Sequence, residues 1–194
     1  MSSIARFVAA LERRAASRSW FFDIYAFPYR ALVARELRLA EVSAGATVMH
    51  IGCGSLPFTA VLTAQLSGAR VIGVDRDADA VVKARAVVAR LELRERVSIL
   101  EADASVDRLP TADVILVALQ AGPKTAIYRN IARCAEAGPG RRAVRVVFRL
   151  PRPGLEGEYG TFTPSAPSAR AVRHRMPTFD RSELHLVDRS RYVA

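Results

Sequence analysis

The apolar positions of the chain fall into short runs that are separated by glycines, acids and stretches with helical spacing. The run at residues 48–51 predicts a buried strand that ends in a tight turn at Gly52 and Gly54. An apolar stripe over residues 60–66 predicts a helix directly behind this turn. A second apolar run ends in Asp75, which lies 23 residues after Gly52. This order of strand, glycine turn, helix, strand and acid predicts a unit that binds a nucleotide-type cofactor.

The same alternation continues along the chain. Further helices are expected over residues 78–91 and 124–137, and further strands over 97–100, 112–119, 143–148 and 182–187. The strand over 112–119 is continuously apolar after Asp113, which is typical of a parallel strand covered on both faces. The last strand is expected to join the sheet antiparallel at its edge. Together these elements predict an α/β fold with a doubly wound, Rossmann-like sheet.

Two helices are expected before the first strand. Residues 3–18 have an amphipathic pattern, and a second helix is expected from Pro28 to Ala40, because proline favours the first helical turn. We therefore divide the chain into an N-terminal helical flank or lid, residues 1–40, and a Rossmann-like cofactor-binding domain, residues 41–194.

Glycines and acids in this pattern suit a ligand that carries a ribose and a base. Glycine has no side chain, so the main chain can approach a ligand closely. Asp75 is well placed for ribose hydroxyls, and Asp103 for the exocyclic amine of an adenine. Alternatively, the glycines only make a turn and Asp75 only caps the next helix. A nicotinamide dehydrogenase shares this turn, but here Pro57 replaces the third glycine and no catalytic constellation follows.

Glu36 has two competing interpretations. It shares a mainly apolar helix face with Tyr29, Leu32 and Val33, where a carboxylate is unusual. Either it lies at the edge of that face and pairs with an arginine, or it faces a substrate. In the second case Glu36, or Tyr29 on the same helix face, is a candidate for proton transfer with the substrate. Residues 150–170, rich in proline and glycine, predict a long loop over the strand ends.

The composition of the chain indicates the cellular compartment of the protein and excludes some kinds of site. A chain of 194 residues suits one domain with its own core. Cys53 and Cys134 are too few for a disulfide framework, so we expect reduced thiols and a cytoplasmic location. No signal peptide or membrane span is supported. His50, His174 and His185 lack zinc-ligand spacing, so no metal site is expected.

The formal net charge of +10 would normally indicate a nucleic-acid partner. However, Lys83 and Lys124 are the two lysines among 29 basic residues, which leaves 27 arginines and indicates a genome-wide codon bias. The arginines are spread along the chain, and no stretch interleaves them with aromatic residues. We therefore expect a small-molecule substrate, and we expect neither nucleic acid nor a membrane as partner.

Several segments together resemble a known superfamily. Ile51-Gly52-Cys53-Gly54 with the acids Asp75 and Asp103 resembles the cofactor elements of class I S-adenosylmethionine-dependent methyltransferases. More specifically, the chain resembles nicotianamine synthase-like enzymes over about residues 25–160. The segments that carry this resemblance are Gly52-Cys53-Gly54-Ser55-Leu56-Pro57-Phe58-Thr59, Asp75-Arg76-Asp77, Val117-Ala118-Leu119 with Lys124 soon after, and the Tyr29 to Glu36 helix.

This resemblance implies S-adenosylmethionine as cofactor and a transferase that acts on a small amine or amino-acid-like molecule. It implies cofactor contacts at Gly52, Cys53, Gly54, Leu56, Asp75, Arg76, Asp103, Ala104 and Leu119. It implies catalytic roles for Glu36 and Tyr29, and substrate contacts at Tyr25, Arg149 and Tyr159. Either the methyl or the aminocarboxypropyl group can be transferred, because the sulfonium makes each attached carbon electrophilic. A nucleic-acid methyltransferase and a non-catalytic cofactor-binding module are the alternatives.

Overall fold

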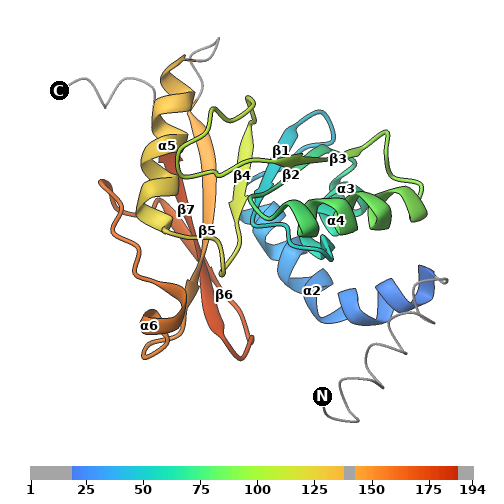
Figure 1. The fold of residues 1–194 in the computed structure, drawn as a ribbon. Helices are drawn as coiled ribbons and strands as arrows, with labels where there is room; N and C mark the ends of the chain where they lie inside the picture. Colours follow the sequence, from blue (N-terminus) through green and yellow to red (C-terminus); the bar gives the residue numbers. More distant parts are fainter. Residues whose placement is uncertain (1–18, 138–142, 188–194) are drawn as a thin grey trace.

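A seven-stranded sheet forms the centre of the molecule (Figure 1). The computed structural model describes residues 19–137 and 143–187, with side chains described from residue 27 on except for Pro28. The strands lie in the order β3-β2-β1-β4-β5-β7-β6. Their bounds are β1 Thr47–Ile51, β2 Arg70–Asp75, β3 Val97–Glu101, β4 Val114–Val117, β5 Val144–Pro151, β6 Arg170–Arg173 and β7 Phe179–Val187.

Strand direction locates the binding edge of the sheet. Strands β1 to β5 are parallel, and β1 lies between β2 and β4, so the strand order reverses between β1 and β4. Strands β7 and β6 are added antiparallel, β7 against β5 and β6 against β7. In open α/β sheets, ligands bind beyond the carboxyl ends of the strands at such a reversal. The glycine turn directly follows β1 and therefore lies at this position.

Helices cover both faces of the sheet (Figure 1). On one face, Met49 of β1 packs in a cluster with Ile131 of α5. On the other, Val48 packs with Ala60 of α3 and Val81 of α4. The predicted doubly wound, Rossmann-like α/β fold is therefore confirmed. The helices are α2 Ser19–Leu39, α3 Phe58–Ser67, α4 Ala78–Arg90, α5 Lys124–Ala137 and the single turn α6 Glu156–Tyr159.

Helix α2 is longer than the sequence pattern suggested. It begins at Ser19 and continues through Pro28, where the helix was expected to start. Figure 1 shows α2 bending along its length, as expected when a proline removes a backbone hydrogen bond inside a helix. No described helix, α2 included, has the length and hydrophobicity needed to cross a bilayer. The helix expected over residues 3–18 lies outside the described residues, and the division at residue 40 stays a prediction.

The C-terminal segment also departs from the expected pattern. The stretch expected as a loop contains α6, and it leads into β6. Strand β6 pairs with the outer side of β7, so β7 is not the edge strand. The pattern missed β6 because this strand has no apolar run: Arg170, Ala171 and Arg173 are exposed, as suits a protected sheet edge.

Candidate cofactor and substrate site

The turn after β1 uses its two glycines differently. Both have a positive φ, 77° at Gly52 and 64° at Gly54, which glycine adopts without strain. A Cβ at Gly52 would lie 2.9 Å from the Cβ of Ala121, so Gly52 allows the turn to pack against the segment after β4. A Cβ at Gly54 would meet no atom within 4 Å. Gly54 therefore borders open space, where its main chain can approach a ligand.

Asp75, at the end of β2, ties the next strand to this turn. Its Oδ2 accepts a hydrogen bond from the Gly54 N–H at 2.7 Å, and its Oδ1 accepts one from the Asp77 N–H at 3.1 Å. The residue that caps α4 is Asp77, which accepts from the N–H groups of Asp79 and Ala80. Asp75 therefore does not act only as a helix cap. Each of its oxygens keeps a lone pair for a ligand hydroxyl.

The end of β3 is connected to the end of β2 and carries the second acid. The Ala102 N–H donates to the Asp75 carbonyl at 3.0 Å. Asp103 accepts from the Ser105 hydroxyl at 2.6 Å and from the Ser105 N–H at 2.9 Å. These bonds hold the pKa of Asp103 below its ordinary value, so its carboxylate is ionised at neutral pH. The neighbouring Ala104 is buried, and its carbonyl accepts from the Asn130 amide.

The other predicted cofactor residues lie in differing surroundings. Cys53 is buried, and burial together with the nearby Asp75 raises the pKa of its thiol to about 12. It therefore stays protonated and serves as a small packing residue. Leu56 and Arg76 are exposed beside the turn. Leu119, beyond the end of β4, is buried, and its carbonyl accepts a 2.6 Å hydrogen bond from the Lys124 ammonium.

A buried ion pair lies between α2 and β5. The Arg149 guanidinium donates from Nε to Glu36 Oε1 at 2.9 Å and from a terminal nitrogen to Oε2 at 2.7 Å. That terminal nitrogen also donates to the Thr59 hydroxyl at 3.1 Å. Glu36 is 1% exposed and Arg149 is 6% exposed. The expectation that Glu36 pairs with an arginine is met, but its expected place at the edge of the helix face is wrong.

Two residues of the C-terminal hairpin extend this ion pair into a hydrogen-bonded chain. The Ser182 hydroxyl donates to Glu36 Oε1 at 2.7 Å and lies 2.9 Å from His174 Nε2. Because the hydroxyl proton is used toward Glu36, His174 must donate its Nε2 proton to Ser182, which assigns the tautomer. Burial keeps the pKa of His174 below its ordinary value, so the ring is neutral.

Two of the three predicted tyrosines have described surroundings. Tyr29 is half-buried and stacks on Phe58, with ring centroids 6.0 Å apart and an interplanar angle of 15°. Tyr159 packs against the buried cluster that contains Leu119 and that lies under α2. Tyr25 belongs to α2, and its side chain lies outside the described part. The catalytic and substrate contacts assigned to these residues stay predictions.

Four polar residues at this edge were not singled out as site residues by the sequence: Thr59, Lys124, His174 and Ser182. His174 directly follows β6 and Ser182 lies on β7, and neither strand has a motif. Lys124 had a signal, because it is one of two lysines in a chain that otherwise uses arginine. His50 lies near the end of β1 and is buried. Burial, with a smaller contribution from Arg149, lowers its pKa to about 3, so it is neutral.

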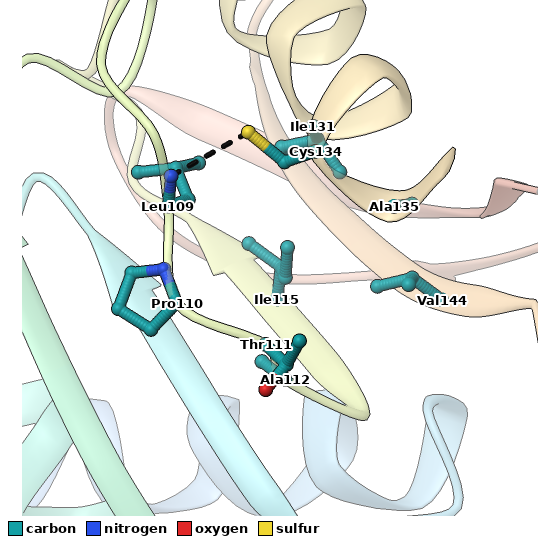
Figure 2. A pocket seen from close by; sticks show the side chains of 9 residues that line it. All are labelled: Leu109, Pro110, Thr111, Ala112, Ile115, Ile131, Cys134, Ala135 and Val144. Carbon is teal, nitrogen blue, oxygen red and sulfur yellow. Dashed lines mark hydrogen bonds between the residues drawn. The ribbon is translucent and has the colours of Figure 1, made fainter. Parts of the chain in front are cut away.

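The pocket in Figure 2 lies elsewhere, at the start of β4 and β5 beside the end of α5. The Cys134 sulfur there accepts a 3.5 Å contact from the Leu109 N–H. No predicted site residue lines this pocket, so it is separate from the binding edge. Its lining is Leu109, Pro110, Thr111, Ala112, Ile115, Ile131, Cys134, Ala135 and Val144.

Comparison with known proteins decides the family. The sequence profile of the protein-L-isoaspartate (D-aspartate) O-methyltransferase family matches residues 27–125, about half of the chain, including the glycine turn and both acids. The chain belongs to this methyltransferase family. It is thus a class I S-adenosylmethionine-dependent methyltransferase by fold and family, as the sequence predicted. The cofactor prediction, S-adenosylmethionine, is confirmed with it. The open space at Gly54, beside Asp75 and near Asp103, suits an adenosyl group.

Individual relatives are named for different substrates. The ribosomal RNA small subunit methyltransferase A of Anaeromyxobacter sp. (strain K) is 40% identical over 99 residues, which are 48% of this chain and 32% of that protein. The ribosomal protein L11 methyltransferase of Aeromonas hydrophila is 33% identical over 127 residues, 65% of this chain and 42% of that protein. The matches thus span less than half the length of these relatives.

Solved structures of methyltransferase-like proteins share the fold. MtNAS, a nicotianamine synthase, solved as a variant in complex with S-adenosylmethionine, has a TM-score of 0.76 and 23% identity, covering 93% of this chain and 71% of that one. An RNA methyltransferase from Salinibacter ruber in complex with S-adenosyl-L-homocysteine has a TM-score of 0.59 and 19% identity, covering 81% and 91%. At these identities the likeness shows the fold alone.

We expect Asp75→Ala to weaken S-adenosylmethionine binding by about 1–3 kcal/mol, because the hydrogen bonds to a charged acceptor are lost. The matched control is Asp77→Ala, which removes the α4 cap and should cost about 0.5–2 kcal/mol of stability while the affinity stays unchanged. Calorimetry on both variants measures this. If the native protein bound a nicotinamide dinucleotide and did not bind S-adenosylmethionine, the assignment of S-adenosylmethionine as cofactor would be wrong.

Gly54→Val should abolish cofactor binding with a smaller loss of fold stability, because the new side chain enters the open space beside the turn. Gly52→Ala is the contrasting control. Its Cβ meets Ala121, so the melting temperature should fall in that variant even without ligand. Thermal melts with and without S-adenosylmethionine separate the two effects. If S-adenosylmethionine raises the melting temperature of Gly54→Val as much as that of the native protein, the glycine turn does not bind the cofactor.

Proposed function

We propose that this protein is an S-adenosylmethionine-dependent transferase that acts on a small amine or an amino-acid-like molecule in the cytoplasm. The observation that carries this proposal is the buried chain Glu36–Arg149 with Ser182 and His174, beside the glycine turn. A buried, fixed carboxylate next to a cofactor site is suited to an amine. The stacked Tyr29 and Phe58 supply aromatic faces nearby, which favour a cationic group.

S-adenosylmethionine, when bound, supplies an electrophilic carbon next to a sulfonium. The protein must then hold an unprotonated nucleophile in line with that carbon and exclude water. Glu36 Oε1 already accepts two hydrogen bonds and Oε2 accepts one. A remaining lone pair on Oε2 can accept from an amine. Arg149 donates to both oxygens of the Glu36 carboxylate. Glu36 is therefore better suited to orient the amine and to stabilise its developing positive charge than to accept its proton. Tyr29 is then the candidate that accepts the proton, which requires its phenolate form and returns the neutral phenol.

Two group transfers fit the same residues. Aminocarboxypropyl transfer is favoured by the resemblance of the Tyr29 to Glu36 helix to nicotianamine synthase-like enzymes, and the fold likeness to MtNAS extends over 93% of the chain. Methyl transfer is favoured by the family profile, which is named for an O-methyltransferase. The carbon that reacts depends on how the cofactor is oriented relative to the nucleophile.

Methylation of a ribosomal component is the second candidate function. It is supported by the relatives named for ribosomal RNA and ribosomal protein and by the formal charge of +10. The expectation that nucleic acid is not a partner is therefore not supported by these relatives. Against this candidate stands the burial of Glu36 and Arg149, which are 1% and 6% exposed and so offer little surface to a large RNA.

Product analysis tests the proposed function. The protein is incubated with S-adenosylmethionine and, in parallel, with a panel of amino acids and amines or with ribosomal RNA. Methylthioadenosine as the by-product with an amine establishes aminocarboxypropyl transfer, and S-adenosylhomocysteine with an amine establishes methyl transfer. S-adenosylhomocysteine that accumulates only with RNA would replace the small-molecule proposal by the second candidate.

Glu36→Gln should lower turnover by about 10²–10³ while S-adenosylmethionine affinity hardly changes, because the charge that faces the amine is lost. The variant should also lose about 3–5 kcal/mol of stability, since Arg149 is left buried without its counter-ion. Turnover is therefore measured well below the melting temperature, on protein whose near-ultraviolet circular dichroism is native.

Ser182→Ala is the control for this variant. It removes one hydrogen bond to Glu36 Oε1 but leaves the charge, so it should retain most of the turnover. Normal turnover in folded Glu36→Gln protein would remove this residue from the site and leave Tyr29 as the better candidate.

A further inference from the structure

Lys124 is a buried cation without a carboxylate partner. It is 1% exposed, at the first position of α5. Its ammonium donates to the Leu119 carbonyl at 2.6 Å and to the Tyr159 carbonyl at 2.8 Å. No carboxylate of the described residues lies within 4.0 Å of it. An ammonium has three donors, so one N–H of Lys124 has no protein acceptor among the described residues.

Its position is the binding edge of the sheet. Leu119 belongs to the segment after β4 that packs on the glycine turn, where a Cβ on Gly52 would lie 3.2 Å from Ala118 Cβ and 2.9 Å from Ala121 Cβ. Tyr159 belongs to the segment after β5, and its side chain packs in the cluster that includes Leu119 and Tyr29. Lys124 thus joins the two segments that border the site on the side away from Asp75.

An ammonium held in this way is costly unless an anion offsets its burial. Moving a charge out of water is unfavourable, and two neutral carbonyls compensate it only in part. Burial lowers the pKa of Lys124 to about 8, with no carboxylate acting against the shift. Every other basic residue of the chain except Lys83 is an arginine. A compact ammonium suits a point contact to one more acceptor, whereas the wide guanidinium fork suits a carboxylate that is already in the protein, as at Glu36.

We propose that Lys124 binds the carboxylate of an α-amino acid group at the site, with its ammonium held toward the ligand by the Leu119 and Tyr159 carbonyls. This inference rests on the proposed function, and it makes a free carboxylate a requirement of the ligand. Two sources carry that group: the amino acid tail of the cofactor and an amino-acid-like acceptor. The experiment distinguishes them.

The first arm tests the cofactor tail with two nucleosides that differ in it. S-adenosylhomocysteine has the α-amino acid group, and methylthioadenosine lacks it. If Lys124 binds the tail, Lys124→Met should weaken S-adenosylhomocysteine binding by about ten- to a hundredfold, the usual loss for a hydrogen bond to a charged group. Methylthioadenosine affinity should stay within about twofold. Lys83→Met removes the chain's other lysine, which lies on α4, and should change neither affinity.

The second arm tests the acceptor on the native chain, where folding of a variant is not in question. Trace acetylation followed by mass spectrometry reports the reactivity of Lys124 against Lys83. A bound carboxylate favours the protonated amine, which does not react. With methylthioadenosine present, L-2-aminobutyrate should slow acetylation of Lys124 but not of Lys83, and the neutral 2-aminobutanamide should slow neither.

Either result supports the proposal and names the source of the carboxylate. The proposal is overturned if Lys124→Met binds S-adenosylhomocysteine as the native protein does and L-2-aminobutyrate leaves acetylation of Lys124 unchanged. If Lys124→Met does not fold, Lys124→Arg takes its place in the first arm. The proposal is then overturned if Lys124→Arg binds S-adenosylhomocysteine with unchanged affinity and L-2-aminobutyrate does not slow acetylation of Lys124 in the second arm. A native protein that binds neither nucleoside contradicts the proposed function itself, which is a different outcome.

Discussion

The buried contact between Glu36 and Arg149 holds together the elements around the start of α3. It joins α2, before the glycine turn, to β5, near the end of the sheet, and the two residues are 113 positions apart. Burial alone would lower the pKa of the Arg149 guanidinium, but the adjacent carboxylate outweighs this and raises it. The pair compensates its desolvation only with good geometry and further hydrogen bonds, and Thr59 and Ser182 supply those bonds. Removing any one of these partners leaves a buried charge less well compensated.

This contact also explains how the C-terminal hairpin is tied to α2. Ser182 on β7 and His174 after β6 reach Glu36 only because β7 pairs antiparallel with β5 and places Ser182 opposite Arg149 in the register. Without that pairing, Glu36 would keep its arginine but lose the bond that fixes Oε1. The antiparallel addition to an otherwise parallel sheet therefore does more than cover an edge. It completes the polar surroundings of one carboxylate.

The local parts of this arrangement could be predicted from sequence, and the distant contacts could not. The glycine turn, Asp75 and the alternation of strands and helices follow from spacing along the chain, and the fold class was predicted from them. The partner of Glu36 could not be chosen, because 27 arginines were available and the choice depends on strand register. Strand β6 was missed because an exposed, arginine-rich edge has no apolar alternation. The start of α2 was misplaced because Pro28 normally begins a helix.

The arginine-rich composition hides the two basic residues that matter most at this edge. A net charge of +10 describes the solvated surface, where the choice between arginine and lysine has little consequence. In the interior the choice has a geometric cause. The planar fork of Arg149 matches both oxygens of Glu36, while the ammonium of Lys124 fits between two carbonyls that come from different strand ends. Among the described residues, Arg149 and Lys124 are therefore distinguished by their burial and by the acceptors that hold them, which the total charge does not reveal.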